Sequence, residues 1–287
     1  MKSKVYFTSK ITPDMMIEMY KQLGVELKGN IAVKLHSGEV GNQNFLRPEF
    51  MRPIVKHVNG TIVECNTAYK GERNTTEKHK KTIEYHGWSG IGSVDIMDED
   101  GDLVLPVKNG IHLDVNYVGK NIEKYDSLLV LSHFKGHPMG GFGGALKNIS
   151  IGIASAYGKA YIHGVKVPEN IWSADHDAFI ESMADAASTI HDMYKGKVAY
   201  INVMCNMSVD CDCCAKAEDP CMSDIGILAS LDPLALDQAC VDLVYASEDK
   251  GRDHMVERIE SRNGTLILDA ADRLNIGSRE YELINID

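Results

Sequence analysis

Runs of apolar, β-branched residues alternate along this chain with segments of helical period, and this alternation most limits the fold. It is typical of α/β proteins with a parallel sheet. We therefore predict an α/β fold with a Rossmann-like layered core and a largely parallel sheet. At 287 residues the chain suits a single α/β domain over 1–287, or two lobes near 1–125 and 126–287. The expected strands are Ile31–His36, Thr61–Asn66, Ser127–Phe134, Lys197–Cys205, Asp224–Ala229 and Thr265–Leu268.

Between these strands, several helices have recognisable ends. Thr12 and Pro13 begin one helix and Gly24 ends it, while Asp232 and Pro233 begin another. A third is expected over Asp177–Tyr194, where apolar residues recur along one face. The section 95–120 contains Asp-Gly and Asn-Gly pairs between short apolar runs, which predicts a small β-hairpin insertion.

The charge of the chain excludes some classes of partner. A net charge of −11 without a basic stripe argues against a nucleic-acid partner. The N-terminus has no apolar signal segment, and no apolar run reaches the length of a membrane span. We therefore expect a cytoplasmic protein without a membrane partner, in which the seven cysteines stay reduced.

A glycine-rich stretch, HFKGHPMGGFGGALKN, follows the strand at Ser127–Phe134. Such a strand-to-helix turn presents free backbone N–H groups and suits an anion, although the glycines could equally serve close packing. Leu146 stands where a dinucleotide fingerprint needs glycine or alanine, so the spacing gives no support for NAD or flavin. The expected ligand-binding residues here are Lys135, Gly140, Gly141, Gly143, Gly144 and Asn148.

Three side chains of this stretch are candidate catalytic residues. His133 or His137 would transfer protons near neutral pH, and Lys147 would hold the anion together with the glycines. The two histidines are also four residues apart, as in helical metal sites, but Gly136 and Pro138 disfavour a helix there.

The stretch NMSVDCDCCAKAEDPC follows the strand at Lys197–Cys205 and contains four cysteines. Three interpretations remain open: a metal or iron–sulfur site, a redox-active or nucleophilic thiol, and a loop whose cysteines pack inside while Asp210 and Asp212 accept backbone hydrogen bonds. The metal would be iron, an iron–sulfur cluster or zinc. Its candidate ligands are Cys211, Cys213, Cys214 and Cys221.

Two more polar loops follow strands. After Thr61–Asn66, Tyr69 and Arg73 are candidates for binding a carboxylate or phosphate, and a helix from Thr75 or Thr76 to Gly87 should carry His79 and His86 on a solvated face. After Ile31–His36, the loop holds Lys34, His36, Glu39 and Arg47. Four polar, glycine-bearing loops at strand ends predict a cleft for a small molecule.

The ordered motifs KLHSGE, NTAYKG-R, SHFKGHPMGGFGGALKN, INVMCNMSVDCDCCA and SDIGILASLDPLALDQACVDLV resemble those of domain-of-unknown-function family 362, often labelled iron–sulfur centre proteins. The resemblance runs from about Ile31 to Val244. Many members carry a ferredoxin-like module with two cysteine runs, which would fall near Tyr161–Trp172. This chain has YIHGVKVPENIW there, so it resembles a version that lacks the module and its pair of four-iron clusters.

The resemblance carries over a core of polar residues and implies a substrate or metal site that works without the clusters. We expect a metal- or thiol-dependent enzyme of redox character that acts on a small anionic molecule. The alternative is a non-catalytic metal or iron–sulfur protein that docks a redox partner protein. A homodimer is also expected for an acidic α/β enzyme of this size. The matching positions are His133, Lys135, Gly136, His137, 140–144, Lys147, Asn148, 210–214, Asp224, Asp232, Pro233 and Asp237.

Overall fold

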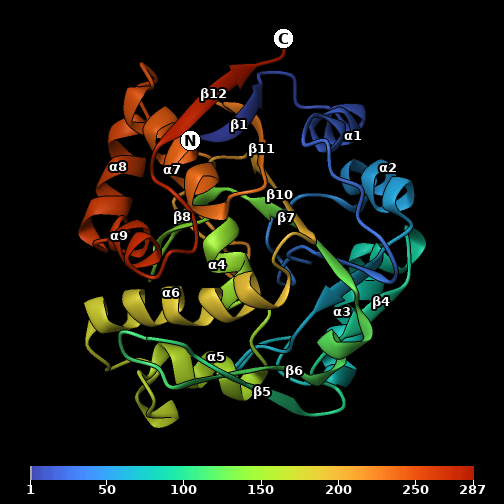
Figure 1. Cartoon of the computed structure of the whole chain (residues 1–287), viewed down its shortest axis with the longest axis vertical. Helices are drawn as coiled ribbons and strands as arrows, with labels where there is room; N and C mark the ends of the chain where they lie inside the picture. The colour runs from blue at the N-terminus through green and yellow to red at the C-terminus, as the bar shows by residue number, and fades with distance from the viewer. Residues whose placement is uncertain (1) are drawn as a thin grey trace.

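A computed structural model describes residues 2–287 and shows a central sheet of eight strands in the order β12-β1-β11-β10-β7-β2-β3-β4 (Figure 1). Every strand runs in the same direction except β11, which is antiparallel to both of its neighbours. The predicted α/β class and largely parallel sheet are confirmed. The strands of the sheet are β1 (Ser3–Thr8), β2 (Ile31–Lys34), β3 (Thr61–Glu64), β4 (Val94–Ile96), β7 (Ser127–His133), β10 (Val198–Met204), β11 (Gly226–Ser230) and β12 (Tyr281–Asn285).

Helices cover both faces of the sheet and divide the core in two. Alternate residues of each central strand face opposite clusters, so that Leu128 and Val130 of β7 pack on one side and Leu129 and Leu131 on the other. Helices α1 (Pro13–Gln22), α2 (Pro48–Val58) and α3 (Thr76–His86) belong to the smaller cluster. The larger cluster includes α4 (Ala145–Ser150), α5 (Ala156–His163), α6 (His176–Met193), α7 (Pro233–Ala246), α8 (Arg252–Ser261) and α9 (Leu266–Arg273).

The helix ends follow the predicted capping signals. Thr12 accepts a hydrogen bond from the Met15 backbone at the start of α1, and Gly24 adopts a φ of 62° just after its end. Asp232 caps α7 in the same way through Leu234 and Ala235. Within residues 2–287, no helix combines the length and apolar character needed to cross a bilayer.

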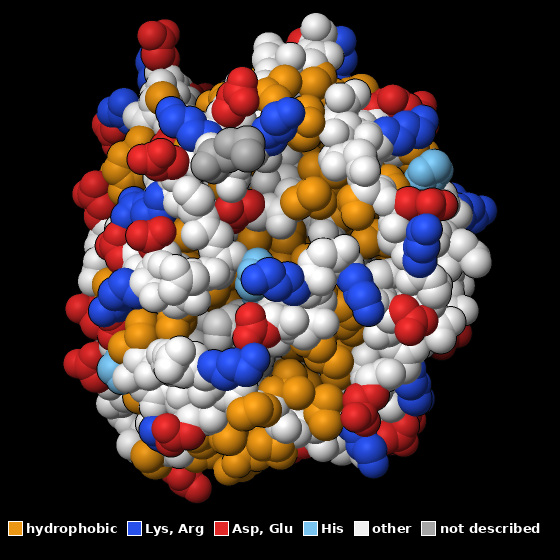
Figure 2. Space-filling model, in the orientation of Figure 1, with side chains coloured by type: hydrophobic (Ala, Val, Ile, Leu, Met, Phe, Trp, Pro, Cys, Tyr) orange, Lys and Arg blue, Asp and Glu red, His pale blue; other side chains and the backbone are white. Residues whose placement is uncertain are grey.

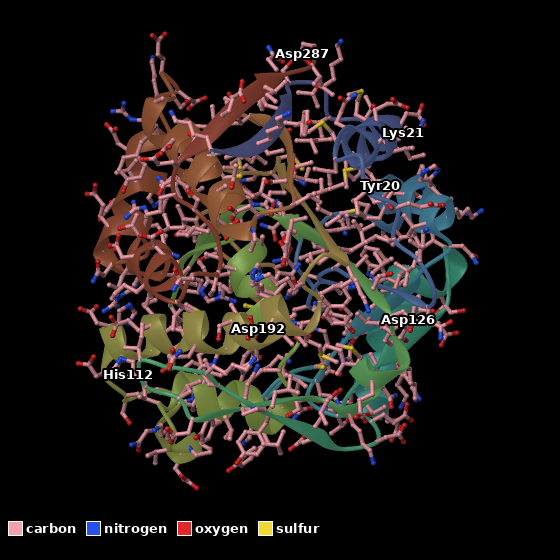
Figure 3. The ribbon with its side chains drawn as sticks, viewed as in Figure 1. Tyr20, Lys21, His112, Asp126, Asp192 and Asp287 are labelled. Atoms are coloured by element: carbon pink, nitrogen blue, oxygen red, sulfur yellow. The ribbon has the colours of Figure 1, made fainter. Side chains whose placement is uncertain are left out.

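The predicted hairpin insertion is confirmed as β5 (Asp102–Pro106) paired with β6 (Val115–Gly119). In Figure 3, His112 of the β5–β6 connection lies near α6, where its Nε2 is 2.7 Å from the Glu181 carboxylate. A second hairpin was not predicted: β8 (Lys135–His137) pairs with β9 (Gly141–Gly143) inside the glycine-rich stretch. That stretch is therefore not a simple strand-to-helix turn.

One predicted strand is wrong, and three strands of the central sheet, β1, β4 and β12, were missed. Thr265–Leu268 begins helix α9, because the apolar residues continue at helical spacing through Ala270 and Ala271 and are buried along that face. Strands β1 and β12 pair with each other at one edge of the sheet, where β12 is largely exposed. The Asp287 side chain, labelled near the C-terminus in Figure 3, accepts a hydrogen bond from Thr8 at the end of β1.

Asp237 of α7 joins three elements beneath the glycine-rich stretch. Its buried carboxylate accepts hydrogen bonds from the backbone of Ala145 and Leu146 at the start of α4, at 2.8 and 2.9 Å. It also accepts one from Asn202 of β10 at 2.7 Å. Burial raises the pKa of Asp237 to about 6 in spite of these hydrogen bonds.

We predict that Asp237→Asn changes the pH dependence of stability. Because the folded-state pKa of Asp237 is about 6, above that of an unfolded aspartate, its contribution to stability is present at low pH and is lost as the pH rises through 6. Relative to the variant, the wild-type free energy of unfolding should therefore rise by about 2 kcal/mol from pH 7 to pH 4. Urea unfolding at several pH values measures this.

The exposed Glu257→Gln on α8 is the control and should give the wild-type profile. A pH-independent difference between wild type and Asp237→Asn would contradict the assignment.

Candidate functional site

The four predicted loops surround one cavity of about 300 Å³ at the carboxyl ends of β2, β3, β7 and β10. A volume of this size accommodates a small metabolite. A fifth segment, from α5 to Trp172, completes the wall. The residues from the predicted loops are Lys34, His36, Glu64, Thr67, Tyr69, Arg73, Ser132, His133, Lys135, His137, Gly143, Gly144, Lys147, Asn148, Cys211, Cys213 and Cys214.

The cavity wall is rich in cations although the chain as a whole is acidic. Five lysine and arginine residues line it, against one carboxylate, that of Glu64. On the face shown in Figure 2, basic and acidic side chains are interspersed instead. This concentration of positive charge suits a negatively charged ligand. The five cations are Lys34, Arg73, Lys135, Lys147 and Lys159.

Asp212 ties the cysteine loop to the strands on the other side of the cavity. Its buried carboxylate lies 3.0 Å from His133 Nδ1 and 3.3 Å from Lys135 Nζ. Burial disfavours charge on Lys135, but the attraction of Asp212 outweighs it and raises the pKa of Lys135. The Asp212 carbonyl also accepts from the backbone of Glu39, which brings in the loop after β2.

His133 is fully engaged by the protein. Besides the contact with Asp212, its Nε2 lies 2.6 Å from the Cys205 carbonyl oxygen. Neither ring nitrogen is left to bind a metal or to exchange a proton with a ligand in the cavity. Proton transfer by His133, as predicted from the sequence, would require one of these two contacts to break.

Arg73 is buried, with 2% of its surface exposed. Its Nε donates to Glu39 at 3.3 Å, and its Nη1 lies 3.9 Å from Glu64, which is itself paired with Lys34 at 2.7 Å. Its Nη2 is buried and has no hydrogen-bond partner among the described residues. An unsatisfied, buried guanidinium nitrogen is costly, so an acceptor from a ligand would stabilise it.

Lys147 also faces the cavity, and its Nζ makes no hydrogen bond or ion pair within residues 2–287. The predicted role of the glycines beside it requires a correction. The first two N–H groups of α4 are taken by Asp237, so they are not available to an anion. Gly143 and Gly144 line the cavity, whereas Gly140 and Gly141 pack against Gly264.

Asn148 lines the same wall and donates from its side chain to the Leu131 carbonyl and the Ser132 hydroxyl, at 3.2 and 3.1 Å. These bonds fix Asn148 against the end of β7. Its amide nitrogen is thus committed to the protein.

The cysteine loop places three thiols at the cavity and one elsewhere. Cys211, Cys213 and Cys214 line it, and the potential ligand atoms of His137, Cys211 and Cys213 lie within 4.8 Å of one another. These three donors could hold a metal ion. Cys221 does not line the cavity, and its thiol donates to the Met207 carbonyl at 3.3 Å. A four-cysteine site that includes Cys221 is therefore not assembled.

His137 accepts two hydrogen bonds on Nδ1, from the backbone N–H groups of Met139 at 3.1 Å and Gly140 at 2.8 Å. The neutral ring therefore carries its proton on Nε2, and a ring nitrogen lies within 4.8 Å of the Cys211 sulfur. Burial lowers the pKa of His137 to about 4, so the ring is neutral at pH 7. It is placed to donate to a thiolate.

The thiols differ in acidity. A hydrogen bond with Cys213 lowers the pKa of Cys214, which is half-buried. A hydrogen bond with Cys213 and burial raise the pKa of Cys211 to about 11. Cys214 is thus the more nucleophilic partner at neutral pH. Sequence inspection could have found this pair, because Cys211 and Cys214 have Cys-x-x-Cys spacing and the Cys214 N–H donates to the Cys211 carbonyl.

Other residues of the site were missed or misplaced. Lys159, His163 and Trp172 line the cavity from a segment in which the sequence gave no ligand-binding signal. His79 was expected on a solvated face but is fully buried, with its ring nitrogens 3.3 Å from Asn66 and 3.4 Å from Ser37. His79 faces inward because it contacts the loops after β2 and β3, whereas His86 is partly exposed.

One protein-family model matches residues 31–242, which include every segment of the cavity wall. This chain belongs to that family, the domain of unknown function DUF362. The description of DUF362 assigns no cofactor. No curated protein matches the chain.

Two solved structures are similar to this DUF362 chain at low identity. The lactate racemase apoprotein from Thermoanaerobacterium thermosaccharolyticum has 15% identity and a TM-score of 0.43, with 69% of this chain and 50% of that one covered. A protein from Thermotoga maritima has 14% identity and a TM-score of 0.45, with coverages of 91% and 58%. The chain thus spans little more than half the length of these proteins.

We predict that Cys214 is the fastest-reacting thiol of the native DUF362 protein. Its lowered pKa increases the thiolate fraction, so iodoacetamide at pH 8 should alkylate Cys214 at least about tenfold faster than Cys221. Mass spectrometry with fragmentation of quenched digests resolves the individual cysteines.

Cys221 is a matched control, since it is also half-buried but has a raised pKa. The buried Cys240 should react last, and equal rates at Cys214 and Cys221 would contradict the order.

Proposed function

We propose that this protein is a thiol-dependent redox enzyme that reduces a small anionic molecule in the cavity. The observation that carries the proposal is the arrangement of three thiols of unequal acidity on a wall otherwise lined by five cations. Cations attract the anion and stabilise thiolates, and the Cys-x-x-Cys spacing suits reversible disulfide formation.

In the proposed reaction, the Cys214 thiolate forms a covalent bond with the acceptor. Cys211 or Cys213 then attacks the Cys214 sulfur, which breaks that bond, forms the disulfide and releases the reduced acceptor. Two thiols lose two protons and two electrons, which the acceptor gains. A ring nitrogen of His137 lies within 4.8 Å of the Cys211 sulfur, from where the imidazole would support ionisation of this thiol. An external dithiol, small or carried by a partner protein, then returns the thiols to the reduced state.

A metal centre is the second candidate, favoured by the short separation of His137, Cys211 and Cys213. The donor set, two thiols and one imidazole, fits a soft ion such as zinc or iron with one open position. However, a histidine that ligates through Nε2 normally donates its Nδ1 proton to a neighbour. Here Nδ1 accepts from two backbone N–H groups, which favours thiol chemistry without a metal.

The test uses tetrathionate, a small dianion that accepts two electrons from a pair of thiols and leaves as two thiosulfates. After its metal content has been measured, the reduced protein should form one disulfide per chain within the region 211–214 when tetrathionate is added. Dithiothreitol should reduce this disulfide again. Cys214→Ser should slow the oxidation at least about tenfold, and Cys221→Ser should leave the rate unchanged. Peptide mapping and thiosulfate release measure the outcome.

Absence of a disulfide within 211–214 would refute the redox proposal. Near-stoichiometric zinc or iron in anaerobically purified wild type, lost in the variant with serine at 211, 213 and 214, would establish the metal candidate in its place.

A further inference from the structure

Two cations in the cavity wall have unused hydrogen-bonding capacity, and they come from different loops. Arg73 follows β3 and has a buried Nη2 without a partner, while Lys147 lies in α4 and has an unpaired Nζ among the described residues. The other three lining cations are already engaged: Lys34 with Glu64, Lys135 with Asp212 and Lys159 with the Ala154 carbonyl.

Arg73 and Lys147 line the same cavity as Cys213, although Arg73 also pairs with Glu39 and Glu64 through its other nitrogens. A ligand that reaches both cations therefore shares the cavity with this thiol. The side chains of Lys147 and Lys135 lie close together. A Cβ atom added to Gly143 would lie within 4 Å of both Lys135 Nζ and Lys147 Cδ. Among the described residues, Glu64 gives the cavity lining its one carboxylate, while Glu39 and Asp212, which lie outside the lining, pair with Arg73 and Lys135.

The remaining wall suits a short carbon skeleton. Tyr69 and Trp172 lie with their rings 6.0 Å apart, and Ile151 and Ile171 add apolar surface. Trp172 is 67% exposed and marks the mouth of the cavity. The cavity wall thus combines two cations that have unused donors with an apolar surface.

Resting on the proposed function, we propose that the substrate carries two anionic groups, one bound by Arg73 and the other by Lys147, on either side of the group that meets the Cys213 and Cys214 thiols. Substrates of this class are dicarboxylates and carboxylates with a second acidic group. Each anion replaces a missing partner of one cation, and the guanidinium fork of Arg73 favours a planar carboxylate.

The test compares the binding of succinate and butyrate, which have similar skeletons but two charges and one charge, by calorimetry on the reduced full-length chain. Succinate should bind at least about tenfold more tightly than butyrate. Lys147→Met should remove this preference, whereas Lys216→Met, an exposed lysine of the cysteine loop outside the cavity wall, should preserve it.

Arg73→Lys keeps the positive charge beside Glu39 and Glu64 but removes the forked guanidinium group. This variant should therefore also bind succinate about tenfold more weakly than the wild type. This variant keeps the proposal testable if Lys147→Met does not fold. Equal affinities for succinate and butyrate, binding of neither at millimolar concentration, or an unchanged preference in both variants would overturn it. Because binding is measured without thiol oxidation, the two-anion proposal and the redox proposal fail independently.

Discussion

The buried contacts of Asp212 with His133 and Lys135 are the interactions on which the site depends. Asp212 belongs to a loop beyond β10, whereas His133 and Lys135 belong to β7 and β8. Separating such a buried group from its partners typically costs about 3–5 kcal/mol. That penalty holds the cysteine loop against the glycine-rich hairpin, and Asn42 adds hydrogen bonds from a third loop to the carbonyls of Cys211 and Cys214. The thiols are thereby fixed beside the lysines rather than left on a solvated loop.

The polar residues of the site divide into those that build it and those that remain free for a ligand. His133, Asp237 and the amide nitrogen of Asn148 are occupied by protein partners, which position strands, helix and loop. Arg73 and Lys147 keep unused donors. A site in which the scaffold is satisfied internally and only a few donors face the cavity is preorganised, because binding then requires little rearrangement.

Sequence patterns predicted local structure well where one physical rule applied over a long segment. The strands around β7 and β10, the capped helices α1 and α7 and the hairpin of β5 and β6 all follow from periodicity, capping and turn chemistry. Prediction failed where tertiary contacts determine whether a side chain is buried or reaches the cavity. Whether His79 is buried depends on Ser37 and Asn66, and Lys159 and Trp172 reach the cavity only because α5 folds back beside β6. Such partners are distant in the sequence, and no local pattern encodes them.

The chain is acidic as a whole but its cavity is lined by cations, so electrostatics affects the association rate and the binding affinity of an anion in opposite ways. At a distance, an anion experiences the field of a molecule with a net charge of −11, which slows its approach. Within the cavity, it meets five nearby cations in a partly dry environment, where salt screens poorly. Added electrolyte therefore reduces the long-range repulsion more than the short-range attraction. For the proposed anionic ligand, moderate ionic strength should therefore accelerate association, whereas added salt slows the association of enzymes that attract their anionic ligands by long-range steering.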